Sequence, residues 1–393
     1  MIRNILLGVL LAVSLGANAQ RDTLSLNRGW QFKYGNSSST AQNTDFSTSD
    51  VQQVNLPHDF QISQPWVAPA KNEKADNSDQ AANVKSRLSA RAFKEMGVGV
   101  YRKVLHAPKE WQGRRLLLDF GGIMLVGDVY LNGNRIGGTD YGYVGFDIDV
   151  TKQLRYGADN VLVVVANTMA PNNSRWYTGG GLYRDVRLIA TNRDLYFEHH
   201  PLFLSTPGNK QLNVTAEVSN YTKSPSGLIE VAILDANGRQ VAVHKQSLTF
   251  SRKRRTREYV LDSIPLSNPQ LWSCDHPYLY TAVVSLYRND GTLADRVSEQ
   301  FGVRTFEFSP QFGLKLNGEK VILKGIANHH TLGSLGAAAY PRAIEKRIKL
   351  LKSFGFNHIR CSHNPYSEDL YRLCDKYGII VIDELYDKWL QQY

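Results

Sequence analysis

The sequence predicts a multidomain protein in which two all-β sandwiches precede a parallel α/β segment. The length of 393 residues suits two or three domains. Short alternating apolar runs fill residues 21–304, and from about residue 305 the pattern changes to alternating strands and helices. A composition of 42% hydrophobic and 21% charged residues excludes wholesale disorder. The net charge of +10 is compatible with an anionic partner.

The N-terminus has the pattern of a secretory signal peptide. Arg3 is followed by the apolar run Ile5–Leu15 and by the small-residue site Ala17–Ala19. We expect residues 1–19 to be a signal peptide and the protein to be secreted or periplasmic; the alternative is a buried first helix. The run is short for a membrane span, so we expect no span after cleavage.

Residues 20–195 are expected to form a jelly-roll sandwich. Leu116–Phe120 and Val161–Val165 are typical strands, and Asn132-Gly133 between two apolar runs predicts a hairpin. Residues 62–96 interrupt this rhythm as a long polar segment, within which Ser86–Met96 could form a short helix.

Residues 196–304 are expected to form an immunoglobulin-like β-sandwich, because a second set of alternating strands covers a length typical of that fold. The basic cluster of residues 252–257 lies here. A polyanion site is one interpretation of it, and a solvated turn with gatekeeping charges is the favoured one. No aromatic residue interleaves with these arginines in the sequence, so we expect no nucleic-acid partner.

From about residue 305 the pattern indicates a parallel sheet with crossover helices. Glycines and a proline mark where these helices begin and end. The expected elements are a strand at Val321–Leu323, a helix from Pro341 to Gly355, a strand at Ile359–Cys361, a helix between Ser367 and Gly378, and a strand at Ile379–Ile382. The three cysteines, Cys274, Cys361 and Cys374, are interpreted as small buried apolar residues.

Polar residues follow each of these three strands, where the carboxyl ends of parallel strands commonly form an active site. They are either functional or structural hydrogen-bonding groups at the loop starts. A metal site from His329, His330, His363 and Glu384 is a further alternative, but neighbouring histidines on an extended segment point in opposite directions, so we expect no metal. The residues are Asn328, His329 and His330, then Ser362, His363 and Asn364, then Asp383 and Glu384.

Signatures of several other enzyme classes do not occur in the sequence. It contains no G-x-S-x-G nucleophile elbow, no P-loop and no H-E-x-x-H zinc motif. The run Gly179–Gly181 lacks the spacing of a dinucleotide-binding loop. We therefore expect no cofactor.

Seven different short motifs follow one another along nearly the whole chain. They are Asn27–Phe32, Leu56–Phe60, Tyr101–Lys103, Arg175–Val186, Lys324–His330, Ile359–Pro365 and Leu373–Glu384. Their residues and their order resemble glycoside hydrolase family 2, the family of β-galactosidases and β-glucuronidases. The resemblance implies that residues 305–393 are the start of a (β/α)8 TIM barrel, incomplete because a whole barrel has about 250 residues.

The resemblance implies a retaining β-glycosidase acting on a carbohydrate substrate, a β-galactoside or a related glycan. It gives His329 and His363 the role of binding sugar hydroxyls, which neutral histidines suit because they donate and accept hydrogen bonds. Asn364 and Glu384 join them as substrate-binding candidates, and Asp59 and Arg175 are candidates at the rim of the pocket.

The resemblance places the acid/base glutamate after the fourth barrel strand and the nucleophile after the seventh. Both positions lie beyond Tyr393, so we expect no catalytic glutamate in this sequence and an inactive chain, since retention needs two carboxyl groups. The alternative is a non-catalytic carbohydrate-binding fragment that acts through its jelly roll.

Overall fold

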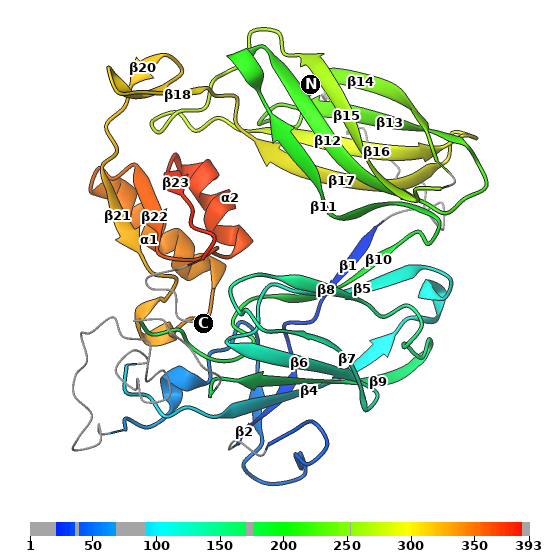
Figure 1. The fold of residues 1–393 in the computed structure, drawn as a ribbon, viewed down its shortest axis with the longest axis vertical. Helices are drawn as coiled ribbons and strands as arrows, with labels where there is room; N and C mark the ends of the chain where they lie inside the picture. Colours follow the sequence, from blue (N-terminus) through cyan, green and yellow to red (C-terminus); the bar gives the residue numbers. More distant parts are fainter. Residues whose placement is uncertain (1–20, 36–38, 68–91, 170–175, 252, 387–393) are drawn as a thin grey trace, which may run out of the picture.

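The computed structural model describes residues 21–35, 39–67, 92–169, 176–251 and 253–386. Figure 1 shows the two β-sandwiches at opposite ends of the long axis, with the α/β segment beside their connection. The predicted fold class is confirmed, as a jelly-roll sandwich, an immunoglobulin-like sandwich and a parallel α/β segment follow one another. The expected signal peptide lies outside the described residues.

The jelly-roll sandwich consists of two antiparallel sheets. One sheet has the order β1 (Asp22–Ser25), β10 (Val186–Thr191), β5 (Arg115–Phe120) and β8 (Phe146–Asp149). The other has the order β3 (Gln52–Val54), β2 (Trp30–Gly35), β4 (Val98–Ala107), β9 (Ala158–Asn167), β6 (Val126–Leu131) and β7 (Asn134–Thr139).

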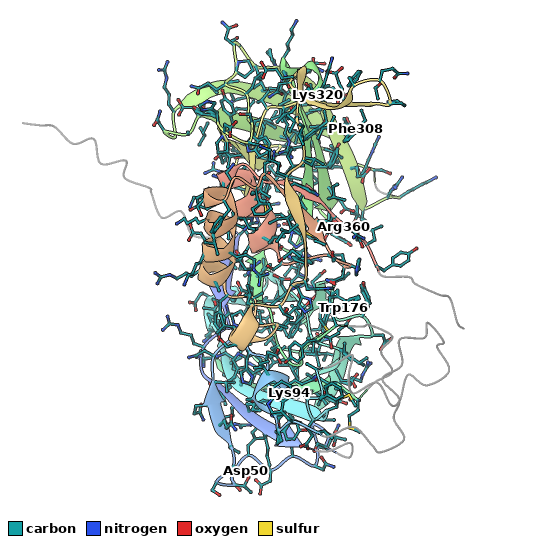
Figure 2. All side chains as sticks on the ribbon, turned by 90° about the vertical axis from the view of Figure 1, so that its left-hand side faces the viewer. Asp50, Lys94, Trp176, Phe308, Lys320 and Arg360 are labelled. Atoms are coloured by element: carbon teal, nitrogen blue, oxygen red, sulfur yellow. The ribbon has the colours of Figure 1, made fainter. Side chains whose placement is uncertain are left out.

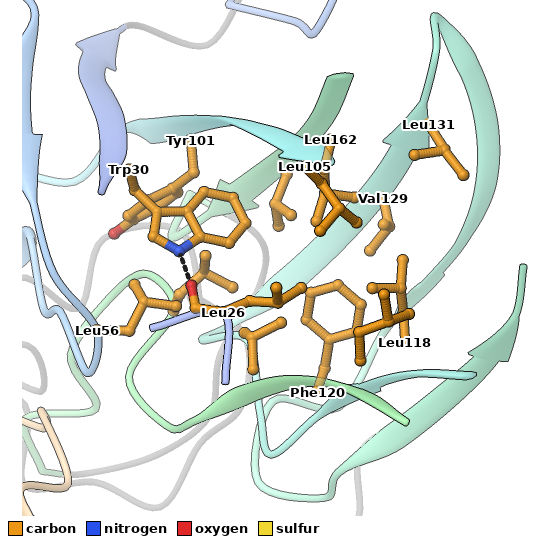
Figure 3. Packing of buried hydrophobic residues seen from close by; sticks show 14 of the residues in the cluster. Leu26, Trp30, Leu56, Tyr101, Leu105, Leu118, Phe120, Val129, Leu131 and Leu162 are labelled. Atoms are coloured by element: carbon orange, nitrogen blue, oxygen red, sulfur yellow. Dashed lines mark hydrogen bonds between the residues drawn. The ribbon is translucent and has the colours of Figure 1, made fainter. Parts of the chain in front are cut away.

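The core of this sandwich lies between the two sheets. Figure 3 shows Trp30 and Tyr101 of one sheet beside Leu118 and Phe120 of the other, all almost fully buried. The indole Nε1 of Trp30 donates a 2.6 Å hydrogen bond to the carbonyl of Leu26, so the buried polar atom is satisfied.

Two local predictions in this domain have different outcomes. The hairpin at Asn132-Gly133 is confirmed: both residues have positive φ, 51° and 85°, as a type I′ turn requires. The helix suggested for Ser86–Met96 is not present in residues 92–96, and residues 86–91 lie outside the described part. Instead, Val67 donates a backbone hydrogen bond to Phe93, and Trp66 forms a bridge with Lys94.

The second sandwich packs a three-stranded against a four-stranded antiparallel sheet. The first has the order β11 (Leu195–Ser205), β12 (Gln211–Asn220) and β15 (Thr256–Pro265). The second has the order β14 (Gln240–Thr249), β13 (Ser226–Leu234), β16 (Tyr280–Arg288) and β17 (Leu293–Phe301). Alternate residues of β13 are buried, as a strand with one face on a core requires.

A small sheet of β18 (Phe306–Ser309), β19 (Gly313–Leu316) and β20 (Glu319–Lys320) leads into the α/β segment. There β21 (Gly325–Asn328), β22 (His358–Cys361) and β23 (Ile380–Ile382) pair in parallel, linked by α1 (Pro341–Ser353) and α2 (Glu368–Tyr377). The short 3-10 helices are η1 (Gln61–Ser63), η4 (Lys109–Trp111), η5 (Pro207–Asn209) and η6 (Gly333–Leu335). Within the described ranges, no helix is long and apolar enough to cross a membrane.

The first strand of this sheet begins later than predicted, at Gly325 instead of Val321. Asn357 explains the shift, because its amide and its backbone N–H bond to residues 322 and 324 and hold this stretch outside the ladder. Val321 packs with a separate cluster around Trp272 instead. The predictions for both helices and the later strands are confirmed to within a residue or two, and all three cysteines are buried.

The jelly-roll core generates a stability prediction. Leu118→Ala should lower the free energy of unfolding of this sandwich by about 2–5 kcal/mol, because Leu118 is fully buried and the substitution leaves a cavity. Urea titration followed by tryptophan fluorescence measures the loss. Val104→Ala is the control: Val104 is 47% exposed, and its replacement should cost less than about 1 kcal/mol. Equal losses in the two variants would contradict the assignment of this core.

Candidate functional site

Three aromatic side chains meet where the strands of the parallel sheet end. His329 follows β21 and His363 follows β22, and Trp176 reaches them from the jelly-roll domain. The Trp176 ring stacks on His329 with a centroid distance of 5.0 Å and lies 5.3 Å from His363. The two histidine rings are 5.8 Å apart. The structure therefore brings together two of the predicted residues and a tryptophan from another domain.

The predicted residue Glu384, which follows β23, joins this cluster through a charged network. Its Oε2 lies 2.7 Å from Nδ1 of His363, and its Oε1 accepts a hydrogen bond from Arg360 of β22. Figure 2 shows Arg360 and Trp176 on the same side of the molecule. Burial by itself raises the pKa of Glu384, but the hydrogen bonds from His363 and Arg360 outweigh it and hold that pKa below 4.5. Glu384 is thus an ionised acceptor at neutral pH.

The adjacent residues His329 and His330 point to different surroundings, as expected for an extended segment. Burial, and next the charge of His363, lower the pKa of His329, so it is neutral at neutral pH. The ring of His330 is buried next to Tyr143, and its Nε2 lies 3.1 Å from the carbonyl of Thr178.

The four side chains of the alternative metal site do not converge, because His330 is turned away from the other three. Over the described ranges, no group of three or more histidine, cysteine, aspartate or glutamate side chains is placed to hold a metal ion. The pKa of His330 falls to about 3 because the ring is buried.

Asp59 is buried, only 5% exposed, and lies between the jelly roll and the α/β segment. Its Oδ1 accepts hydrogen bonds from the backbone N–H groups of Gln61 at 3.0 Å and Gly180 at 2.9 Å. Its Oδ2 accepts from the hydroxyl of Tyr177 at 2.8 Å and the N–H of Ala337 at 2.7 Å. Both oxygens are occupied by protein donors, so the carboxylate connects loops of two domains.

The remaining candidates do not join the cluster around Trp176. Asn364 is 1% exposed, and its amide lies 3.4 Å from the carbonyl of Pro365. The same carbonyl accepts a 2.8 Å hydrogen bond from Arg184 of the jelly roll, so this loop is also anchored across the domain boundary. Arg175 lies outside the described residues.

Sequence reasoning did not nominate Trp176 or Arg360 for the site, although both lie within motifs that it singled out. Arg360 carries a usable signal: it is a charged residue between two buried apolar ones on a strand, so it must face the opposite side of the sheet. Trp176 carries none beyond its motif, because its position depends on a contact between domains.

Three models of known protein families match the chain, one for each domain seen in the structure. A model described as the sugar binding domain of glycosyl hydrolases family 2 matches residues 24–192. A model described as glycosyl hydrolases family 2 matches residues 197–304, and the TIM barrel domain of that family matches residues 311–388.

Individual proteins show the same relationship. A beta-galactosidase from Bacteroides ovatus is 34% identical over 94% of this chain and 42% of its own length. A beta-glucuronidase from Bacteroides fragilis is 29% identical over 96% of this chain and 51% of its own. The crystal structure of a glycosyl hydrolase family 2 member from Bacteroides cellulosilyticus matches with a TM-score of 0.82 and 34% identity, covering 94% of this chain and 47% of that one.

The sandwiches, the parallel α/β segment and the polar cluster at its edge are the architecture of a multidomain glycoside hydrolase. Within that class, the chain belongs to glycosyl hydrolase family 2, as the resemblance in its motifs implied. It spans about half the length, or less, of the relatives described above.

The burial of His330 generates a prediction on pH. Its pKa is about 3 in the folded chain against 6.5 for an exposed histidine, so the unfolded chain binds the extra proton first. The contribution of His330 to stability is therefore lost as pH falls from 6.5 towards 3, at up to about 1.4 kcal/mol per pH unit.

The variant His330→Phe removes this titration. Urea unfolding of both proteins between pH 6.5 and 3 measures the free energy of unfolding. This free energy should depend less steeply on pH in the variant, by up to about 1.4 kcal/mol per pH unit. Parallel curves for the two proteins would mean that His330 is not held neutral by burial.

Proposed function

We propose that Trp176, His329, His363 and Glu384 bind one sugar ring of a β-glycoside, a β-galactoside or a related glycan. The observation that carries this proposal is the stack of Trp176 on His329 beside His363. An aromatic face suits the apolar C–H face of a pyranose, while the ring nitrogens suit its hydroxyl groups. Both kinds of group converge at the carboxyl ends of the parallel strands, where barrel enzymes build their sites.

Each polar member has a separate role in this proposal. The ionised Glu384 accepts the Nδ1–H of His363 and so fixes the tautomer of that ring. The Nε2 atom of His363 is then left to hydrogen-bond a sugar hydroxyl. Neutral His329 offers the sugar either a donor or an acceptor.

We assign positioning roles to the two buried candidates. Asp59 holds the loop that precedes Gly180, and this loop carries Trp176. Asn364 lies within the loop that carries His363. Arg175 precedes Trp176 directly in the sequence, and we propose it as a contact at the rim for that reason.

The proposed role is binding and not bond cleavage. A retaining glycosidase uses two carboxyl groups about 5 Å apart, one of which must carry a proton. Glu384 is the one carboxylate that the described residues bring to this cluster, and it is ionised and bonded to His363 and Arg360. We therefore propose that hydrolysis of O-glycosidic bonds in the family depends on carboxyl groups other than that of Glu384.

We also propose that the protein is secreted or exported to the periplasm. The support is the charged, apolar and small-residue pattern of residues 1–19. A glycan substrate outside the cytoplasm is consistent with this location.

The binding test uses the full chain and isothermal titration calorimetry with β-galactosides and β-glucuronides. Trp176→Ala and His363→Ala should each weaken binding by about tenfold, as expected for one lost ring contact or hydrogen bond. The nitrophenyl β-galactoside and β-glucuronide should show no turnover above background.

Trp66→Ala is the matched control, because Trp66 is a jelly-roll tryptophan that is 70% exposed and whose ring lies 4.0 Å from Nζ of Lys94, a residue outside the cluster. It should bind the sugar as the wild type does. Turnover near ordinary enzyme rates, about 1–1,000 per second, would refute the binding-only role. Saturable binding that His363→Ala leaves unchanged would instead favour a site in the jelly roll alone.

A further inference from the structure

A second recessed surface lies between the two sandwiches, and it shares no lining residue with the cluster around Trp176. It is a groove of about 880 Å³ lined by jelly-roll loops, by the Asn192–Asp194 link from β10 to β11, and by Tyr196 and Tyr221. Figure 1 shows β10 and β11 meeting at this junction. The backbone N–H of Tyr221 donates a 2.6 Å hydrogen bond to Asp194, which fixes one corner of the groove.

Aromatic and guanidinium groups form a stack along this groove. The guanidinium of Arg115 lies 4.5 Å from the ring centroid of Tyr196, and Tyr221 stacks on Tyr196 at 6.3 Å with an angle of 12°. Arg255 then lies 5.8 Å from the Tyr221 ring. Tyr196 is buried, whereas Tyr221 is 54% exposed, so the outer ring offers an aromatic surface to a ligand.

The fold thus supplies the aromatic ring that the basic cluster lacks in the sequence. Arg255 belongs to that cluster, and its carbonyl accepts a 2.9 Å hydrogen bond from the N–H of Asn220. Because Tyr221 follows Asn220 directly, the end of β12 places an exposed ring beside Arg255, the residue that precedes β15.

The charge of the groove is positive after its internal ion pairs are considered. Its two lining carboxylates are already paired, Asp149 with Arg115 at 3.4 Å and Asp194 with Arg288 at 2.7 Å. Lys152 and Arg193 of the lining are exposed, and so is Arg255, which lies at the edge of the groove beside Tyr221. Within the described ranges none of the three forms an ion pair with a carboxylate. These three cations are therefore available to an anion from solution.

We propose that this groove binds an acidic oligosaccharide, one whose sugar rings carry carboxylate groups. A sugar ring packs on Tyr221, and its carboxylate pairs with the planar forks of Arg193 and Arg255, which match carboxylate geometry. The amide and hydroxyl side chains of the lining suit sugar hydroxyls. Nucleic acid fits less well, because single-strand binders stack successive bases on several exposed rings.

This groove is a binding site without chemistry of its own, since its carboxylates are committed to arginines. Binding of the acidic oligosaccharide in the groove does not require a ligand at the site around Trp176. The groove would hold an acidic chain against the protein independently of which sugar the other site takes.

The test is calorimetric titration of the full chain with oligogalacturonate, with a neutral galactose oligomer and a single-stranded oligonucleotide as separate arms. Oligogalacturonate should bind, and the neutral oligomer should not bind in the groove. Arg193→Glu, Arg255→Glu and Tyr221→Ala should each weaken oligogalacturonate binding by about tenfold, the effect of one charge-assisted hydrogen bond or ring contact. Added salt should weaken binding in the wild type, because the cations are exposed.

Lys346→Glu is the matched control, since it makes the same change of charge at an exposed position of α1 outside the groove. It should bind oligogalacturonate within about twofold of the wild type. If Tyr221→Ala fails to fold by circular dichroism, the two arginine variants decide alone.

Three results would overturn the proposal. They are an absence of oligogalacturonate binding, equal weakening in Lys346→Glu and the groove variants, and tight binding of the oligonucleotide in preference to the uronate. Trp176→Ala should leave uronate binding at the groove unchanged, so the two sites can be refuted separately.

Discussion

The candidate sugar site depends on the buried carboxylate of Asp59. Burial raises the pKa of Asp59, and the hydrogen bonds from its donors act against that rise. A buried carboxyl group without partners would be strongly destabilising, so its position is stable only while its donors are in place. Those donors come from Gln61, Tyr177 and Gly180 in the jelly roll and from Ala337 in the α/β segment. The same loops carry Trp176 and, a few residues earlier in the α/β segment, His329. The stack of Trp176 on His329 therefore exists only when the two domains are docked.

Close backbone approach makes this arrangement possible. Gly179 and Gly336 both have positive φ, and a Cβ atom on either would lie within 3 Å of the Asp59 carboxylate. A second link, from Arg184 to the carbonyl of Pro365, anchors the loop that carries His363. Because these contacts bring the backbone of one domain within hydrogen-bond distance of the other, the site is shaped by an interface and not by one domain.

The sequence predicts the features that neighbouring residues determine, such as turns and helix ends. It misses the features that contacts between distant segments determine. Asn132-Gly133 predicts its turn because two adjacent residues must adopt positive φ, and Gly378 ends its helix for the same local reason. The late start of β21 depends on Asn357, which is distant in the chain and invisible to periodicity. The burial of Asp59 is hidden from the sequence in the same way: a polar residue in a turn is expected at a surface, but distant loops of the jelly roll and the docked α/β segment cover it together.

The two proposed binding surfaces use aromatic rings in opposite electrostatic settings. Around Trp176, burial keeps His329 neutral, and the single negative charge of Glu384 is balanced by Arg360. Such a site recognises hydroxyl groups by the geometry of its donors and acceptors, and desolvation strengthens those contacts. Around Tyr221, the cations remain in water, where attraction is weaker and is screened by salt. Recognition there depends on the charge of the ligand more than on its hydroxyl pattern. Part of the positive charge of the chain thus lies beside the exposed ring of Tyr221. This location is separate from the site at the strand ends.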